Sequence, residues 1–256
     1  MLGAIIGDIV GSRFEFHNTN KYNFKLFDRR ECFFTDDTIC TVAIADALLS
    51  GSDDYASFLQ KCCRKYNEPI RSFGGSFGGW IWQDVPVPYN SFGNGAAMRV
   101  SPISLFCKDE ASVIRCALGS AAVSHNHPEG LVGAMAVALA GFRLMKAVGG
   151  NEKEEAIDSV LDYFYKDVEG SAPGVFDETC QGVVPVALRI VRNSFNFEQA
   201  IRNAIVYGGD SDTLAAIVGG MAEAFFGIPQ ELKDEALSFL PEDMKSVVSS
   251  FYASIG

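Results

Sequence analysis

Apolar residues recur at helical spacing along most of this chain of 256 residues. Few stretches alternate with the two-residue period of a strand. We therefore predict an all-α fold, a single orthogonally packed multi-helix domain over residues 1–256. The helices are expected over residues 2–10, 39–48, 55–66, 111–123, 131–148, 151–166, 178–191, 197–207 and 214–226, with two more that begin at Pro229 and Pro241.

Glycine is densest in residues 72–80, where four glycines are interspersed with aromatic residues. This composition predicts a loop, because glycine lets the backbone turn freely. Its bare amides could wrap a diphosphate, with Gly74, Gly75 and Ser76 as contacts, since the aromatic residues would hold the loop against the core. A flexible connector is the alternative interpretation. Residues 18–30 and 84–91 lack a clear period and are also expected to be loops.

Composition and charge limit the classes of function. A formal net charge of −11 argues against nonspecific binding to nucleic acid, which requires a basic surface. The seven cysteines are an odd number without CxxC spacing, so the sequence suggests neither a disulfide framework nor a zinc site. An apolar share of 48% is enough to bury a substantial core.

The first eight residues are apolar but lack a basic leader and end in Asp8, so we expect no signal peptide. No uncharged stretch approaches the roughly 20 residues of a membrane helix. We expect a cytoplasmic monomer that does not associate with membranes.

One cluster of polar side chains consists of Asp210, Asp212 and Thr213. These residues follow Gly208 and Gly209 and directly precede an apolar helix. One carboxylate would be enough to cap that helix. Two carboxylates carry more negative charge than capping needs, and Thr213 adds a hydroxyl to the same cluster, so a hard cation is the natural counter-charge.

A second cluster, Thr35-Asp36-Asp37, stands before the helix expected over residues 39–48. Each cluster alone could be an ordinary helix cap. Burying both without partners would cost several kcal/mol per charge, so the pair requires metal or tight hydrogen bonding. The predicted metal ligands are Thr35, Asp36, Asp37, Asp210, Asp212 and Thr213.

Five motifs, spread over nearly the whole chain, resemble those of the ADP-ribosylglycohydrolases, a family that includes the dinitrogenase-reductase-activating glycohydrolase and ADP-ribosyl-acceptor hydrolases. In chain order they are Gly7-Asp8-Ile9-Val10-Gly11 followed by Glu15, Thr35-Asp36-Asp37, Phe92-Gly93-Asn94-Gly95-Ala96-Ala97-Met98-Arg99, Ser124-His125-Asn126-His127-Pro128 and Asp210-x-Asp212-Thr213.

The resemblance implies a metal-dependent hydrolase that cleaves the glycosidic bond between ADP-ribose and an acceptor and releases ADP-ribose. The acceptor would be a protein side chain such as arginine or serine, or a small molecule, and the cofactors two divalent cations, Mg²⁺ or Mn²⁺. The catalytic residues would be Asp36, Asp37 and Glu15. The expected substrate contacts are Asp8, Gly74, Gly75, Ser76, Ser91, Phe92, Gly93, Asn94, Gly95 and His125.

Two other functions stay open at this point. One is a non-catalytic ADP-ribose-binding protein, although such relatives tend to lose the metal carboxylates that are all present here. The other is a metal-dependent phosphohydrolase that acts on the diphosphate. Of the two histidines in residues 124–128, His125 is assigned to ligand contact, because magnesium and manganese prefer oxygen ligands, and His127 has a structural alternative.

Overall fold

The helices predicted by the apolar spacing are present in the computed structural model, which describes residues 1–67 and 73–256. Over these residues the fold is all-α, and the only β-pairing is a single bridge between Gly93 and Thr179. The elements are α1 (Leu2–Gly11), α2 (Asp36–Leu49), α3 (Tyr55–Lys65), α4 (Gly75–Trp80), the 3₁₀ turn η2 (Asn94–Ala96), α5 (Ser101–Phe106), α6 (Glu110–Ala122), α7 (Pro128–Lys146), α8 (Gly150–Phe164), α9 (Cys180–Arg192), α10 (Phe197–Tyr207), α11 (Ser211–Phe226), α12 (Gln230–Leu237) and α13 (Glu242–Ile255).

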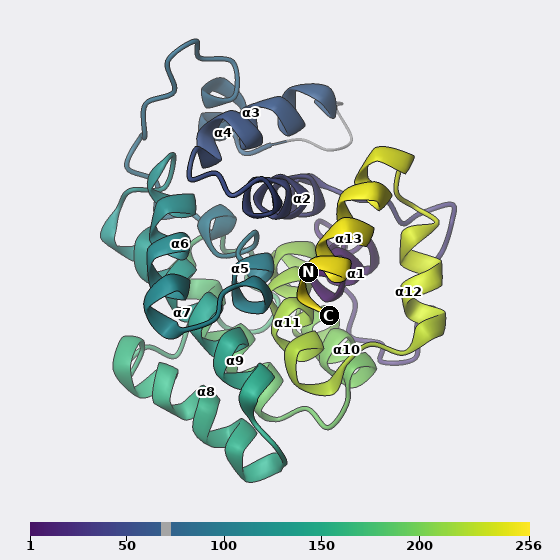
Figure 1. Ribbon diagram of the computed structural model, residues 1–256. Helices are drawn as coiled ribbons and strands as arrows, with labels where there is room; N and C mark the ends of the chain where they lie inside the picture. Colours follow the sequence, from purple (N-terminus) through teal and green to yellow (C-terminus); the bar gives the residue numbers. More distant parts are fainter. Residues whose placement is uncertain (68–72) are drawn as a thin grey trace.

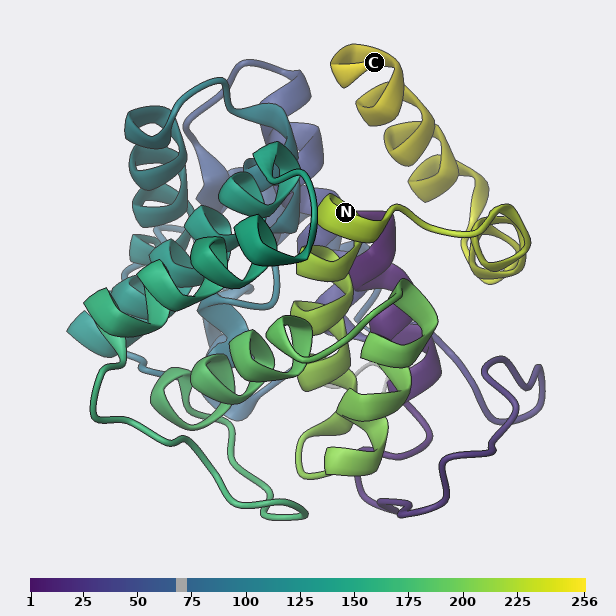
Figure 2. The same ribbon diagram turned by 90° about the horizontal axis from the view of Figure 1, so that it is seen from below.

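Helices α1 and α11 pack side by side in the middle of the molecule (Figures 1 and 2). Glycine lets their backbones touch. A Cβ atom added to Gly7 would lie 1.9 Å from the carbonyl oxygen of Ala215, and one on Gly219 would lie 2.1 Å from that of Gly3. All residues of α1 are buried, so this pair forms the centre of the core.

The other helices surround this pair. Helices α7, α9 and α10 pack on α11, and α2 packs on α1. An outer layer follows, with α3 and α13 on α2, α6 and α8 on α7, and α12 beside α1 (Figure 1). The buried apolar side chains form one continuous cluster, which holds the N-termini of α2 and α11 in fixed positions.

The predicted loop over residues 72–80 is wrong for residues 75–80, which form α4; residue 72 lies outside the described residues. The physical reason is packing. Phe77 and Trp80 are buried, and their rings stack with centroids 5.2 Å apart, which outweighs the low helix propensity of the glycines. Helix α5 has no counterpart among the predicted elements, because its six residues are too few for a periodic signal.

By length and hydropathy alone, α7 could cross a membrane, and it is the one such helix in the described part of the chain. Within its apolar window, 61% of the residues are buried inside the protein. This is weak evidence for a span, because the core helix of a soluble protein passes the same test.

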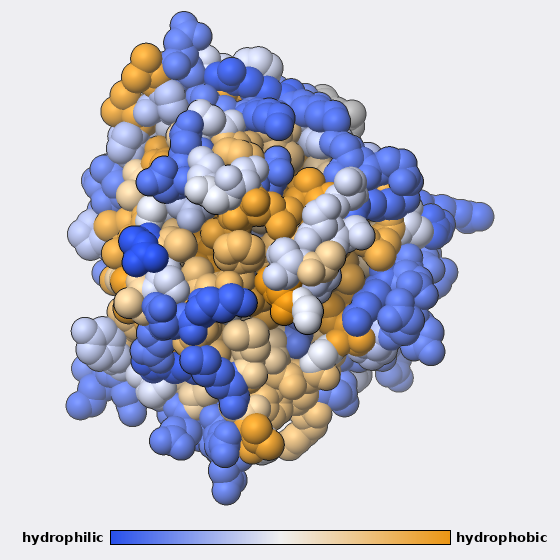
Figure 3. All heavy atoms as spheres, viewed as in Figure 1, coloured by the Kyte–Doolittle hydropathy of each residue, from blue (hydrophilic) through white to orange (hydrophobic). Residues whose placement is uncertain are grey.

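Apolar residues also reach the surface on one face. Figure 3 shows hydrophobic residues gathered over the middle of this face, with polar residues around them. In the same view of Figure 1, this region is where α5, α11 and α13 lie. No large apolar side chain of these three helices is fully exposed, so the patch consists of partly buried side chains at the edge of the core.

We expect Gly7→Ala to lower the free energy of unfolding by about 1–3 kcal/mol or more, because the new methyl group would overlap the α11 backbone. Urea unfolding would measure the change. The matched control is Gly150→Ala, at the exposed start of α8, where an added Cβ meets open space and should change stability by less than about 0.5 kcal/mol. Equal effects of the two substitutions would contradict the packing account.

Candidate metal centre and ligand cleft

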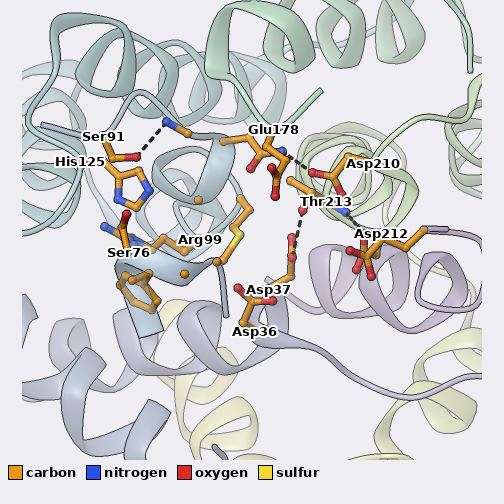
Figure 4. Close-up of a pocket in the computed structure, with 18 of the residues that line it drawn as sticks. Asp36, Asp37, Ser76, Ser91, Arg99, His125, Glu178, Asp210, Asp212 and Thr213 are labelled. Atoms are coloured by element: carbon orange, nitrogen blue, oxygen red, sulfur yellow. Dashed lines mark hydrogen bonds between the residues drawn. The ribbon is translucent and has the colours of Figure 1, made fainter. Parts of the chain in front are cut away.

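A cleft with a volume of about 300 Å³ opens at the N-termini of α2 and α11. Figure 4 shows carboxylates on one side of it and Ser76, Ser91, Arg99 and His125 on the other. The lining residues are Glu15, Asp36, Asp37, Gly74, Gly75, Ser76, Phe77, Tyr89, Ser91, Gly93, Asn94, Gly95, Met98, Arg99, His125, Glu178, Asp210, Asp212 and Thr213.

The two acidic sequence clusters meet in this cleft. Asp37 lies in the first turn of α2 and Asp212 in the first turn of α11. The hydroxyl of Thr213 donates to Oδ2 of Asp37 at 3.2 Å and so joins the two helix ends (Figure 4). Because the N-terminus of a helix carries partial positive charge, both positions favour carboxylates.

Asp8 reaches the same cluster from α1 but does not line the cleft. Its carboxylate is fully buried and accepts hydrogen bonds from the amide of Thr35 at 2.9 Å and the amide of Thr38 at 3.1 Å, and from both threonine hydroxyls. The structure therefore places Asp8 behind the cleft and not at its surface, where a substrate predicted to contact it would lie. Asp8 instead fixes the start of α2 behind the cluster.

Two groups of three carboxylates have the geometry of metal sites. In each group, one oxygen per residue can be chosen so that all three lie within 4.8 Å of one another. The first group is Asp8, Asp37 and Asp212, all of which are buried, and the second is Glu15, Asp210 and Asp212. Asp212 belongs to both groups, so the two possible ion positions are adjacent.

Crowding and burial make these acids difficult to ionise without a cation. Burial, followed by repulsion from neighbouring carboxylates, raises the pKa of Asp37 and Asp212 well above the usual range. The pKa of Asp8 is raised to about 6 by burial, and that of Glu15 to about 7 by burial and by Asp210. Burial and the neighbouring Cys40 also raise the pKa of Asp36.

The residues present fit divalent cations. The Oδ1 atom of Asp37 is buried and has no hydrogen-bond partner in the described part of the chain. A buried oxygen without a partner is costly, and a cation would satisfy it. Carboxylate oxygens are also the ligands that Mg²⁺ and Mn²⁺ prefer. Asp8, Glu15, Asp37, Asp210 and Asp212 would hold the ions.

The other predicted ligands lie close by in different settings. Thr35 is the N-cap of α2, where its hydroxyl donates to Asp8 at 2.7 Å and accepts from the amide of Asp37, and it does not line the cleft. Asp36 lines the cleft but belongs to neither group of three. Asp210, a member of the second group of three, also accepts a hydrogen bond from Nδ2 of Asn94 at 2.6 Å. Their roles as metal ligands remain predictions.

Opposite the acids, η2 and the turn before α7 form a neutral wall. The ring of His125 lies against Gly95, where an added Cβ would be 3.0 Å from Nε2, so glycine permits this close approach. Burial and the nearby Arg99 hold the pKa of His125 well below its usual range, so the ring is neutral. His127 instead caps α7, with Nδ1 accepting from the amide of Glu129.

Most of the predicted substrate contacts line the cleft, namely Gly74, Gly75, Ser76, Ser91, Gly93, Asn94, Gly95 and His125. Phe92 does not. It is 45% exposed, its ring lies against that of His127, and it lines a second, shallower depression beside the cleft. An extended stretch points alternate residues in opposite directions, which explains why Phe92 turns away.

Five lining residues have no counterpart among the predicted site residues, namely Phe77, Tyr89, Met98, Arg99 and Glu178. Glu178 comes to the cleft because its carbonyl oxygen accepts from the amide of Asn94 at 2.7 Å. No sequence pattern pairs these two segments. Arg99, the last residue of the Phe92–Arg99 motif, is fully buried and donates to the carbonyl of Ser120 and the hydroxyl of Ser124.

Comparison with known proteins agrees with the resemblance of the five sequence motifs. A family model described as ADP-ribosylglycohydrolase matches residues 1–255. The chain is 27% identical to the ADP-ribosylarginine hydrolase Tri1 of Pseudomonas putida, with 89% of this chain and 70% of that protein covered. It is 24% identical to the human ADP-ribosylhydrolase ARH3 (90% and 85% covered), and 25% identical to the ADP-ribosyl-[dinitrogen reductase] glycohydrolase of Rhodospirillum rubrum (89% and 84%).

A solved structure described as an ADP-ribosylglycohydrolase-related protein complex is similar to the whole chain. The TM-score is 0.75, and all of this chain and 97% of the other are covered. The sequence identity is 22%, so this similarity shows the fold alone.

We expect the metal-free protein to be less stable at pH 8 than at pH 5. The acids of the cluster have raised pKa values in the folded state, to about 6 for Asp8 and about 7 for Glu15, against about 4 when unfolded. The folded state therefore binds more protons between these values, and its stability falls as pH rises through them. The lowered pKa values of His125, the Met1 amino group and the Cys116 thiol act in the opposite direction, but the acids of the cluster with raised pKa values are more numerous.

Thermal unfolding of metal-stripped protein at both pH values, with and without added Mn²⁺, would measure this dependence. Because protons compete with the cation for the same oxygens, Mn²⁺ should raise the melting temperature more at pH 8 than at pH 5. A gain from Mn²⁺ that is the same at both pH values would contradict the assignment of these carboxylates.

Proposed function

The chain belongs to the ADP-ribosylglycohydrolase family, and from this premise we propose that it is a metal-dependent hydrolase that releases ADP-ribose from an acceptor. The family and its named hydrolase members support a hydrolase acting on glycosyl bonds. Metal dependence is supported by the two groups of three carboxylates, which share Asp212. Within the first group, the buried Oδ1 atom of Asp37 has no hydrogen-bond partner in the described residues. An ADP-ribosylated protein or a small ADP-ribose conjugate is the proposed substrate.

The shape of the cleft suggests how the substrate would lie. On the side of the cleft opposite the acids, glycine-lined backbone at residues 74–75 and 93–95 would contact the diphosphate, together with the His125 ring and the positively charged guanidinium of the buried Arg99. Arg99 forms no ion pair in the described residues, so an anion would balance its charge. The ribose that is joined to the acceptor would then lie over the carboxylates. When bound, the cations would bind the ribose hydroxyls and lower the pKa of a water molecule.

The chain's own acids would carry out the remaining steps. Asp36 lines the cleft outside both groups of three, so its carboxylate is free to orient the attacking water. As the bond from the anomeric carbon to the acceptor nitrogen or oxygen breaks, positive charge develops on the sugar and the surrounding carboxylates stabilise it. Water adds its hydroxyl to that carbon, and a proton passes to the acceptor, with Glu15 as the candidate carrier.

We expect Asp36→Asn and Asp210→Asn each to lower turnover on the order of 100-fold or more, because each removes a charge that the transition state requires, while the fold is retained. The measurement is release of free ADP-ribose from a panel of defined ADP-ribosyl conjugates, with Mg²⁺, Mn²⁺ or EDTA. The matched control is Asp167→Asn, on the exposed surface after α8, which should keep full activity.

The products also separate this proposal from its two rivals. Free ADP-ribose indicates glycosidic cleavage, whereas AMP with a ribose phosphate indicates cleavage of the diphosphate. Binding without any product indicates a non-catalytic ADP-ribose-binding protein. Either of the last two results, or full activity in the Asp36 and Asp210 variants, would overturn the proposal.

A further inference from the structure

The side chain of Asn18 joins the segment that carries Glu15 to the turn before Asp210. Its Nδ2 atom donates to the carbonyl oxygen of Phe14 at 2.7 Å and to that of Gly209 at 2.9 Å. Its Oδ1 atom accepts from the amide of Gly209 at 2.7 Å. The side-chain amide of Asn18 therefore joins the segment around Phe14 to the turn at Gly209, which is distant in sequence.

The turn on the other side of this contact has a shape that favours glycine. Gly208 has a φ of 78° and Gly209 a φ of 83°, in the region that side-chain-bearing residues rarely adopt. A Cβ on Gly208 would lie 2.8 Å from Oδ1 of Asn18, and one on Gly209 would lie 2.5 Å from the carbonyl oxygen of Val175. The turn thus presents the amide and carbonyl of Gly209 to Asn18 at close range.

Glu15 needs such an anchor. Its carboxylate accepts no hydrogen bond within the described part of the chain, and it is repelled by Asp210 and Asp8. It belongs to the second group of three only while its loop stays close to the start of α11. Two weaker contacts also hold this loop. The Ser211 hydroxyl donates to the carbonyl oxygen of Phe14 at 3.4 Å, and the exposed Phe16 ring stacks on the exposed ring of Phe176, with centroids 5.8 Å apart.

We propose that Asn18 is a positioning residue that fixes the Glu15 loop to the Gly208–Gly209 turn and so completes the Glu15, Asp210 and Asp212 group. A neutral amide suits this place, because it donates and accepts without adding charge to crowded carboxylates. The inference rests on the proposed metal-dependent function. It predicts that one of two bound ions depends on Asn18, whereas the ion held by Asp8, Asp37 and Asp212 does not.

The test is a Mn²⁺ titration of the full chain by calorimetry and by electron paramagnetic resonance, without substrate. In the wild type we expect two ions, one of which is weakened in Glu15→Gln. Asn18→Ala should weaken binding of that same ion about 10-fold or more and leave the other within about twofold. If Asn18→Ala does not fold, Asn18→Ser should show the same selective loss.

Two controls separate positioning from a general loss of structure. Asn203→Ala removes an amide in α10 that donates to the Ser194 hydroxyl at 3.2 Å, and it should leave both ions unchanged. In a Glu15→Gln background, Asn18→Ala should cause no further loss, because the residue it positions no longer contributes its charge.

Three results would overturn the inference: an equal weakening of both ions, no weakening of either, or a loss that persists undiminished in the Glu15→Gln background. A wild type without any Glu15-dependent ion would overturn it as well. The titration uses no ADP-ribosyl substrate, so a protein that binds both ions as expected but cleaves no conjugate would refute only the proposed hydrolase activity.

Discussion

The direct contact between the backbones of α1 and α11 is the constraint on which the site depends. A Cβ on Gly11 would lie 2.4 Å from Cα of Asp212, so the last turn of α1 touches the first turn of α11. Asp8 stands one turn earlier in α1. Its carboxylate can share an ion position with those of Asp37 and Asp212 only because no side chain separates the two helices. One added methyl group between α1 and α11 would push the two helices apart and move Asp8 away from Asp37 and Asp212.

This packing brings like charges together, and the fold compensates for them only in part. The N-termini of helices stabilise carboxylates, and so do the hydroxyls of Thr35 and Thr38, which donate to Asp8, and the side-chain amide of Asn94, which donates to Asp210. No lysine or arginine in the described residues forms an ion pair with the cluster. The one buried arginine nearby, Arg99, is directed to the opposite wall. Without a cation, protons neutralise part of the remaining charge, as the raised pKa values of these acids show, and a bound cation would take their place.

Much of the fold could be predicted because helical periodicity and helix-start residues are local signals. The acidic pairs at residues 36–37 and 210–212 stand at the starts of long apolar helices. This local pattern is enough to predict them as parts of one metal site, and in the structure they line the same cleft. Phe77 and Trp80 show the limit. Glycine content predicted a loop there, but burial of the two rings, which depends on the rest of the fold, makes the segment helical. Glu178 reaches the cleft through a backbone contact with Asn94 that no local pattern encodes.

The two carboxylate groups differ in how they are supported, and this difference bears on how the site would work. Asp8, Asp37 and Asp212 stand on three packed helices, so the position they define is as rigid as the core. The second group takes Glu15 from a loop that is held by hydrogen bonds from the Asn18 amide and the Ser211 hydroxyl and by an exposed ring stack. Hydrogen bonds at the surface break more readily than packed helices separate. Among the five carboxylates of the two groups, that of Glu15 is therefore the one whose position depends most on local hydrogen bonds and least on the packed core.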